Sequence, residues 1–330
     1  MMELSRLGEK GLIQRIRSML KTKSEQILLG IGDDAAVVST HPGRKLIFTT
    51  DTLVETVHFD RRYVPIDALG WKALAVNLSD IAAMAGFPLC AVVSLAIPET
   101  WTVEDVDRFY QGMDRCAQAY HCPIVGGDTV RSPQWACITV TVLGEVEESA
   151  FKTRAGAKEG DLLCVTGTIG KARVGWEVLE SGVQDPAFFS AVSHFLQPRA
   201  RIEEAQRLLN AYEVTAMIDI SDGLASEIFH LCEASGLGCQ LFEEKIPVSP
   251  EVFSWARAQK KSIENYLWAS GEEYELLFTV SPQRFFEPMD FFTVIGKMEK
   301  KKHGILLHKE GKDQPFRFKG WDHFRNEYND

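Results

Sequence analysis

Runs rich in β-branched residues alternate with helix-forming stretches along almost the whole chain, and this alternation favours a fold of mixed helices and strands. In the first half, helices are predicted over residues 67–85 and 103–120, with Thr102 as the N-cap of the second. Gly86 and Pro88 predict the end of the first helix. The strands predicted for this half are residues 46–51, 89–98 and 136–146.

The second half continues the pattern after a boundary near residues 149–158. Helices are predicted over residues 199–209 and 223–234, and the predicted strands are residues 161–167, 216–221, 238–242, 275–280, 291–296 and 304–308. A length of 330 residues suggests two domains with sizeable cores. We therefore expect two α/β domains in tandem, spanning residues 1–150 and 151–330.

Seven aspartates lie among small residues, often beside strand-like runs. They are Asp33 and Asp34 in GIGDDAAVV, Asp51 in TTDTL, Asp80 in NLSD, Asp128 in GGDT, and Asp219 and Asp222 in DISDG. Glycine allows the backbone to approach a ligand closely, and aspartate supplies a hard oxygen ligand. Any single Asp-Gly pair could mark only a turn, but the recurrence favours sites for magnesium bound to phosphate.

Local spacing supports this interpretation at two of the motifs. In an extended segment Thr49 and Asp51 project to one side and Thr50 to the other, so the end of a strand presents hydroxyl and carboxylate oxygens. Asn77 and Asp80 lie three residues apart on one face of an alanine-rich helix that we expect to be mostly buried. A buried carboxylate needs a partner, which could be a metal ion, an arginine or a backbone donor.

Composition excludes several other classes of protein. A net charge of -10 and the lack of a basic stripe argue against a nucleic-acid partner. The longest apolar runs are shorter than the ~18 residues that a membrane helix needs, and the amino terminus resembles an amphipathic helix rather than a signal peptide. Seven cysteines without a CxxC pair predict reduced thiols and no zinc site. We expect a cytoplasmic protein with no membrane partner.

The usual phosphate-binding motifs are absent from the sequence. Around Gly170 and Lys171, Val165 stands where a Walker A motif has its first glycine, and Ala172 replaces the serine or threonine. There is also no HRD catalytic loop. We therefore expect phosphate to be held by metal ions and by main-chain N–H groups in glycine turns at GIGDD and GGDT.

Together these motifs resemble those of the thiamine-monophosphate kinase family. Its superfamily includes aminoimidazole ribonucleotide synthetase, selenophosphate synthetase and the hydrogenase-maturation dehydratase. The resemblance covers residues 30–324 and rests on GIGDDAAVV, TTDTLVETVHF, WKALAVNLSDIAAMAG, IVGGDT, TRAGAKEGD, VTGTIG, IDISDGLASE, SGEEYELLFTV and FKGWDHF. It implies two tandem α/β domains, mixed sheets flanked by helices, and a homodimer built on the first domain, which would bind ATP and magnesium.

The resemblance also implies the roles of particular residues. The magnesium ligands would be Asp34, Thr49, Thr50, Asp51, Asp80, Asp128, Asp219 and Asp222. ATP would contact Gly127, Asp128, Arg154 and Ser221, with Tyr110 nearby, and thiamine phosphate would contact His58, Glu272 and Trp321. Catalysis by phosphoryl transfer would depend on Asp51, Asp128 and Arg154. The chain departs from the family pattern in two motifs, because Ser270 and Glu273 replace the first and last residues of GGED, and Trp321 stands where Tyr or Phe is common.

Two alternatives to the kinase remain open on the sequence. Another ATP-dependent synthetase of the superfamily would use the same metals with a different acceptor pocket. The selenophosphate branch carries an amino-terminal cysteine or selenocysteine, whereas the first cysteine here is Cys90. A non-catalytic ATP or magnesium sensor is the second alternative, although all the expected metal aspartates, Arg154 and Glu272 are present.

Overall fold

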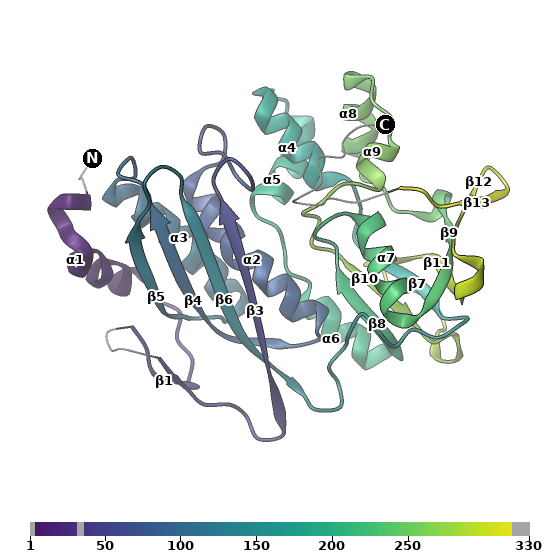
Figure 1. The fold of residues 1–330 in the computed structure, drawn as a ribbon, viewed down its shortest axis with the longest axis horizontal. Helices are drawn as coiled ribbons and strands as arrows, with labels where there is room; N and C mark the ends of the chain where they lie inside the picture. The colour runs from purple at the N-terminus through teal and green to yellow at the C-terminus, as the bar shows by residue number, and fades with distance from the viewer. Residues whose placement is uncertain (1–3, 32–35, 319–330) are drawn as a thin grey trace. The chain divides into compact units, whose positions relative to one another are not determined.

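The computed structural model describes residues 4–31 and 36–318 and divides into two compact units (Figure 1). The first unit contains Met1–Ile81 and Gly86–Phe151, and the second contains Ala82–Ala85 and Lys152–Asp330. Within the described residues, no helix is both long and apolar enough to cross a membrane. Every one of the seven cysteines is a free thiol.

The first unit is built on a four-stranded sheet in the order β3-β6-β4-β5. Its strands are β3 (Arg44–Val54), β4 (Phe87–Ile97), β5 (Ile124–Arg131) and β6 (Cys137–Glu147). Strand β6 is antiparallel to both β3 and β4, and β5 is parallel to β4. Consequently β3, β4 and β5 run in the same direction, and β3 and β5 form the two edges of the sheet. A separate two-stranded pair consists of β1 (Ile27–Leu29) and β2 (Val37–Val38).

Helices of this unit cover one face of the sheet. These are α2 (Ile66–Ala83) and α3 (Val103–Tyr120), which lie behind the strands in Figure 1, whereas α1 (Leu4–Met19) contacts α3. Helix α3 begins with a capping box, in which Thr102 and Asp105 bond each other's main-chain N–H groups. The opposite face is exposed and partly apolar: Phe48 is 69% exposed and Leu46 is 46% exposed.

Two glycines allow α2 and α3 to touch through their main chains. A Cβ atom on Gly70 would lie 1.9 Å from the carbonyl oxygen of Phe109, and one on Gly112 would lie 1.7 Å from the carbonyl oxygen of Asp67. Helices that carry larger residues at their contact pack with their axes about 8–10 Å apart. The glycines therefore bring α2, which carries Asp80, close to α3 and fix the helical layer behind the sheet.

The second unit contains a seven-stranded mixed sheet in the order β13-β12-β9-β11-β7-β10-β8. Its strands are β7 (Leu162–Thr166), β8 (Val214–Asp219), β9 (Leu237–Phe242), β10 (Leu276–Val280), β11 (Phe292–Lys300), β12 (Ile305–Lys309) and β13 (Lys312–Pro315). The β9–β12 pair is parallel and the other pairs are antiparallel. Strand β10, between β7 and β8, is buried along its whole length, in agreement with its mostly apolar run LLFTV.

Helices and short 3₁₀ turns surround this sheet. The helices are α4 (Lys171–Ser181), α5 (Phe189–Leu196), α6 (Ile202–Ala211), α7 (Leu224–Ser235), α8 (Pro250–Gln259) and α9 (Glu264–Leu267). The 3₁₀ turns are Pro186–Phe188, Glu243–Lys245, Pro282–Arg284 and Lys301–His303. One core cluster contains Ile228 of α7 and Leu277, and a second contains Leu208 of α6 and Phe278. Alternate residues of β10 thus enter two different cores.

The predicted class of two α/β units with mixed sheets is confirmed, and so are the predicted strands and helices, with shifts of a few residues at their ends. The expected glycine turn at GGDT is wrong, because Gly127 and Asp128 lie inside β5. A Cβ atom on Gly127 would lie 2.0 Å from the carbonyl oxygen of Val93, so the glycine serves close strand packing. Helices α4, α5, α8 and α9 were not predicted.

We expect Gly112→Ala to destabilise the first unit by about 1–3 kcal/mol, since the new methyl group would overlap the main chain of α2. The midpoint of urea-induced unfolding measures this effect. Gln111→Ala is the matched control on the same helix, because Gln111 is exposed and its substitution should change stability by less than about 0.5 kcal/mol. Equal midpoints for the two variants would contradict main-chain contact between α2 and α3.

Candidate functional site

Three loops of the second unit meet at one edge of its sheet, the edge formed by the ends of the strands. Strands β7 and β8 are both antiparallel to β10, their common neighbour. The carboxyl ends of β7 and β8 therefore lie at the same edge as the amino end of β10. The loops at this edge are residues 167–170, 220–223 and 270–275. Ligand-binding residues commonly occupy such loops, because the rigid sheet positions them.

Main-chain hydrogen bonds join two of these loops beyond the ends of the strands. The N–H of Ile220 donates to the carbonyl of Glu275 over 2.8 Å, and the N–H of Tyr274 donates to the carbonyl of Ile220 over 2.8 Å. The N–H of Glu272 donates to the carbonyl of Ser221 over 2.7 Å. Ser221, predicted to contact ATP, and Glu272, predicted to contact thiamine phosphate, therefore lie on bonded segments.

Carboxylates gather at the start of α7. Asp219 is 5% exposed and Glu227 is 2% exposed, and Glu227 Oε1 accepts the main-chain N–H of Asp222 over 2.9 Å. Burial raises the pKa of the Glu227 carboxyl to about 8; the Asp222 N–H and Arg154 lower it, and the carboxylates of Asp219 and Asp222 raise it. The carboxylates of Asp219 and Asp222 therefore lie close enough to Glu227 to disfavour its charged form, after the larger effect of burial. Such clustered oxygen donors suit a hard cation such as Mg²⁺.

Sequence reasoning missed Glu227, although a signal was available. Glu227 is the fourth residue of α7, and a carboxylate in the first turn of a helix can reach back to main-chain N–H groups at its start. The segment DGLASE therefore contains both a predicted metal ligand, Asp222, and a residue that holds its main chain.

Buried polar contacts of Glu275 anchor the loop of residues 270–275 to the start of α6, through Arg201, and to strand β7, through Thr166. Glu275 is 1% exposed and accepts hydrogen bonds from Arg201 Nε over 2.8 Å and from Thr166 Oγ1 over 2.6 Å. Burial alone would lower the pKa of Arg201, but Glu275 and Glu204 raise it, so the guanidinium stays charged. Within the loop, Glu272 and Tyr274 have φ of 61° and 51°. Such left-handed conformations cost non-glycine residues about 1–3 kcal/mol each, and the anchored loop sustains them.

In the first unit, the predicted ligands divide between the two faces of the sheet. Thr49 and Asp51 point toward the helices, and the Thr49 hydroxyl donates to the Asp80 carboxylate. Asp80 is half-buried, whereas its neighbour Asn77 is fully buried and donates to the carbonyl of Ala73 over 3.2 Å. The structure therefore brings Thr49 and Asp80 into direct contact.

Thr50 and Asp128 lie on the opposite, exposed face. The Thr50 hydroxyl lies 2.9 Å from that of Thr141. Asp128 is in register with Ser94, and Ser94 is in register with Thr139, so their side chains share this face. The side chain of Thr50 therefore cannot join Thr49 and Asp80 on the helix-covered face of the same chain.

Asp51 and Asp128 also occupy opposite edges of the sheet. Asp51 is in register with Val140, Val140 with Val93, and Val93 with Gly127, so three strand spacings separate β3 from β5. At ~4.8 Å per spacing this separation is about 14 Å. The sheet of one chain therefore does not bring Asp51 and Asp128 to one metal ion, because both would need to lie within ~2.1 Å of it.

The remaining predicted residues have varied surroundings. His58 Nδ1 accepts the main-chain N–H of Val54 over 3.0 Å, so a neutral ring carries its proton on Nε2. Arg154 is exposed. Tyr110 is 3% exposed and packs edge-on against Phe109, with ring centroids 5.3 Å apart. Tyr110 is therefore a core residue of the first unit, and its contact with the nucleotide stays a prediction.

Two of the predicted residues, Asp34 and Trp321, lie outside the described residues, as does Asp33. Across residues 4–31 and 36–318, no group of three or more His, Cys, Asp or Glu side chains has the geometry of a formed metal site. Among the predicted ligands, Thr49 contacts Asp80 in the first unit, and Asp219 and Asp222 lie near Glu227 in the second.

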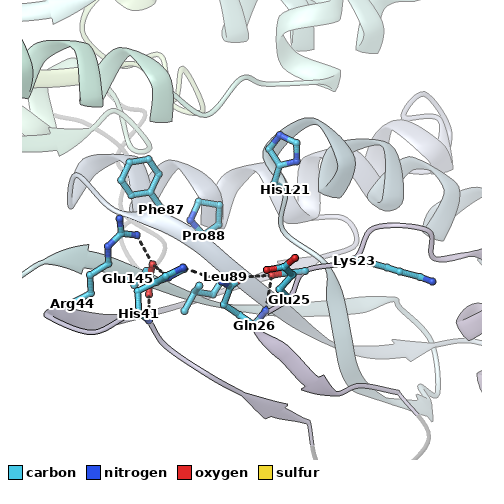
Figure 2. Close-up of a pocket in the computed structure, with 11 residues that line it drawn as sticks. Lys23, Glu25, Gln26, His41, Arg44, Phe87, Pro88, Leu89, His121 and Glu145 are labelled. Carbon is cyan, nitrogen blue, oxygen red and sulfur yellow. Dashed lines mark hydrogen bonds and ion pairs between the residues drawn. The ribbon is translucent and has the colours of Figure 1, made fainter.

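A separate pocket of about 450 Å³ lies in the first unit (Figure 2). Glu145 lies at its base, is 1% exposed, and pairs with His41 and Arg44. Burial would raise the pKa of Glu145, but hydrogen bonds from these two partners bring it below its usual value. The other lining residues are Lys23, Ser24, Glu25, Gln26, Phe87, Pro88, Leu89 and His121. None of the predicted site residues lines this pocket.

Comparison with known proteins supports the resemblance seen in the motifs. Residues 32–146 match the family described as AIR synthase related protein, N-terminal domain, and residues 158–309 match its C-terminal domain. The thiamine-monophosphate kinase of Aquifex aeolicus is 39% identical over 98% of this chain and 100% of its own length. The Bacillus subtilis protein of the same name is 35% identical over 90% of this chain and 94% of its own.

A solved structure extends the comparison to three dimensions. The structure described as "AaThiL complexed with AMPPCP and TMP" superimposes with a TM-score of 0.78 and 39% identity, over 98% of this chain and 99% of that chain. Sequence and fold therefore agree along the whole chain. The chain belongs to the thiamine-monophosphate kinase family, within the AIR synthase related proteins.

Proposed function

We propose that the protein transfers the γ-phosphoryl group of ATP to thiamine phosphate, giving ADP and thiamine diphosphate. The observation that carries this proposal is the bonded pair of loops in the second unit, which holds Ser221 and Glu272 on adjoining segments beside Asp219 and Asp222. The family relationship agrees with it, since the related AaThiL structure was solved with AMPPCP and TMP. The protein is proposed to act in the cytoplasm.

Magnesium is proposed as the metal, because the donor set consists of carboxylate and hydroxyl oxygens. The proposed ligands are Asp34, Thr49, Thr50, Asp51, Asp80, Asp128, Asp219 and Asp222. When bound, Mg²⁺ would neutralise negative charge on the two phosphate groups that react. The crowded carboxylates around Asp219 and Asp222 support this assignment, since each would gain from a nearby cation.

The protein's own residues need only orient two anions and balance their charge. The acceptor is a phosphate oxygen of thiamine phosphate, which is largely ionised at neutral pH because the second pKa of a phosphomonoester is about 6. No general base is therefore required. Arg154 and Ser221 are proposed to contact the ATP phosphates, and Gly127 to offer its main chain. We propose direct in-line transfer without a phosphoenzyme.

The acceptor site is proposed to use Glu272, His58 and Trp321. The thiazolium ring of thiamine is positively charged, so the Glu272 carboxylate complements it, and Trp321 offers an aromatic face. His58 can donate a hydrogen bond from Nε2, because its Nδ1 is occupied by Val54. These assignments rest on the family resemblance, together with the surroundings of His58 and Glu272.

Release of ADP in the presence of ATP and Mg²⁺ tests the proposed function. We expect ADP and thiamine diphosphate in equal amounts when thiamine phosphate is added, and neither product with thiamine alone or without acceptor. ATP binding without transfer would favour the sensor, and ADP release with a different acceptor would favour another synthetase of the superfamily. Either outcome would reject the kinase assignment.

Asp128→Asn should reduce kcat by about 100-fold or more, since it removes a proposed metal ligand that acts in the transition state. Asp290→Asn is the matched control in the same assay, because Asp290 is 89% exposed and only pairs with Arg207 at 3.7 Å. Equal activity of the two variants would remove Asp128 from the site.

Glu272→Gln should raise KM for thiamine phosphate by about tenfold, equivalent to ~1.4 kcal/mol, with little change in KM for ATP. The loss would reflect the missing negative charge opposite the thiazolium. Steady-state kinetics with each substrate varied in turn separates the two constants. A similar rise in both constants would argue that Glu272 supports the whole site and does not select the acceptor.

We propose a homodimer formed through the first unit, with the site completed by a second copy. The exposed sheet face carries Phe48, Leu46 and Val92, and the described residues provide no further strand beside β3 or β5. Unpaired edges and exposed apolar side chains favour association. A second copy could also bring its own Asp128 toward Asp51, which the sheet of one chain separates.

Mixing inactive Asp51→Asn and Asp128→Asn proteins tests this arrangement. After subunit exchange, half of the dimers would contain one copy of each variant, and one of their two sites would have both aspartates. Activity should therefore return to about a quarter of the wild-type value. Each variant exchanged with itself is the control. No recovery from a mixture whose exchange is confirmed would place both aspartates in one subunit's site.

A further inference from the structure

We propose that Glu273 is a positioning residue for the acceptor site: it caps helix α4 from the loop of residues 270–275 and thereby fixes the backbone of Glu272. This inference rests on the proposed function, in which Glu272 contacts thiamine phosphate. It concerns a residue that departs from the family pattern, where aspartate is common at this position.

Glu273 reaches the amino terminus of α4 with a buried side chain. It is 1% exposed, and its Oε1 accepts the main-chain N–H of Gly170 over 2.9 Å and that of Ala172 over 3.2 Å. Gly170 is the N-cap of α4 and has no side chain of its own to supply this bond. A carboxylate is well suited to the position, because the first N–H groups of a helix have no partners within the helix.

Ser270, which also departs from the family pattern, takes part in the same cap. It is fully buried, its hydroxyl donates to Glu273 Oε1, and its oxygen accepts the N–H of Arg173 over 3.3 Å. Three main-chain N–H groups at the start of α4, those of Gly170, Ala172 and Arg173, are therefore bonded to the 270–275 loop. The other carboxylate oxygen, Oε2, lies 3.3 Å from His194 Nε2 of α5.

This cap restrains Glu272 because Glu272 and Glu273 are neighbours along the backbone. Glu272 and Tyr274 both have left-handed φ. Glu273 lies between these two strained residues, and its side chain ties this part of the loop to α4. On the other side, Glu272 and Tyr274 donate their N–H groups to Ser221 and Ile220. The loop is therefore fixed to α4 by side chains and to the 220–223 loop by main chain. Without the cap, the left-handed conformation at Glu272 would lose one of its two supports.

Substitution of Glu273 tests the proposal in the full-length protein. Glu273→Ala should weaken binding of thiamine phosphate, measured by calorimetry without nucleotide, by at least about tenfold and raise its KM in parallel. Binding of AMPPCP with Mg²⁺ should change less than about twofold. Glu273→Gln, which keeps an acceptor oxygen at the same reach, should restore most of the affinity.

The matched control is Glu177→Ala. Glu177 is also a buried carboxylate of α4, but its side-chain partners, Trp255, Tyr266, Arg173 and Lys261, all lie outside residues 270–275. The proposal predicts that Glu177→Ala lowers Tm without a selective loss of thiamine phosphate binding. If both variants lose the same affinity, or if Glu273→Ala weakens AMPPCP as much as thiamine phosphate, the cap only stabilises the fold and the proposal is overturned.

Ser270→Ala provides a second test in case Glu273→Ala does not fold. It removes one donor to Glu273 and one acceptor for Arg173, so a smaller but selective loss of thiamine phosphate binding is expected, and unchanged binding would count against the proposal. Wild-type protein that does not bind thiamine phosphate would instead reject the proposed function, and this inference with it. The two failures are therefore distinguishable.

Discussion

The proposed acceptor site depends on the main-chain pairing of β8 with β10. This pairing continues beyond the strands, into the loop that follows β8 and the loop that precedes β10. Three main-chain hydrogen bonds join residues 220–221 to residues 272–275. Buried Glu275 fixes one end of the arrangement through its pair with Arg201 at the start of α6 and its hydrogen bond from Thr166 of β7. Because these bonds are made by the backbone, the positions of Ser221 and Glu272 follow from sheet register and do not depend on flexible side chains.

The first unit contributes in a different way. Its donors are fixed by the alternation of side chains along β3, which sends Thr49 and Asp51 to the helix-covered face and Thr50 to the exposed face. The close contact of α2 with α3 then sets the position of Asp80. The two edges of the sheet hold donors that one chain keeps apart, and this is the structural reason for proposing a dimer.

Much of this organisation could be predicted from the sequence, because it depends on local patterns. The Thr102 cap, the alternation at residues 49–51 and the β-branched runs are all local signals. The strand at Ile124–Arg131 was missed because its glycines usually indicate a turn, and only the proximity of Val93 explains Gly127. The role of Glu273 depends on a partner 103 residues away, at the start of a helix that was not predicted, so no local pattern could assign it. Glu227 is different, because its partner Asp222 is five residues away and its helix was predicted.

The central claim is that one phosphoryl group passes directly from ATP to thiamine phosphate. A single-turnover experiment with γ-labelled ATP, quenched at short times, tests it most directly. The account predicts that label leaves ATP and enters thiamine diphosphate in one phase, with none on the protein. Label trapped on the protein would contradict direct transfer, and label released only as inorganic phosphate would contradict the kinase assignment itself.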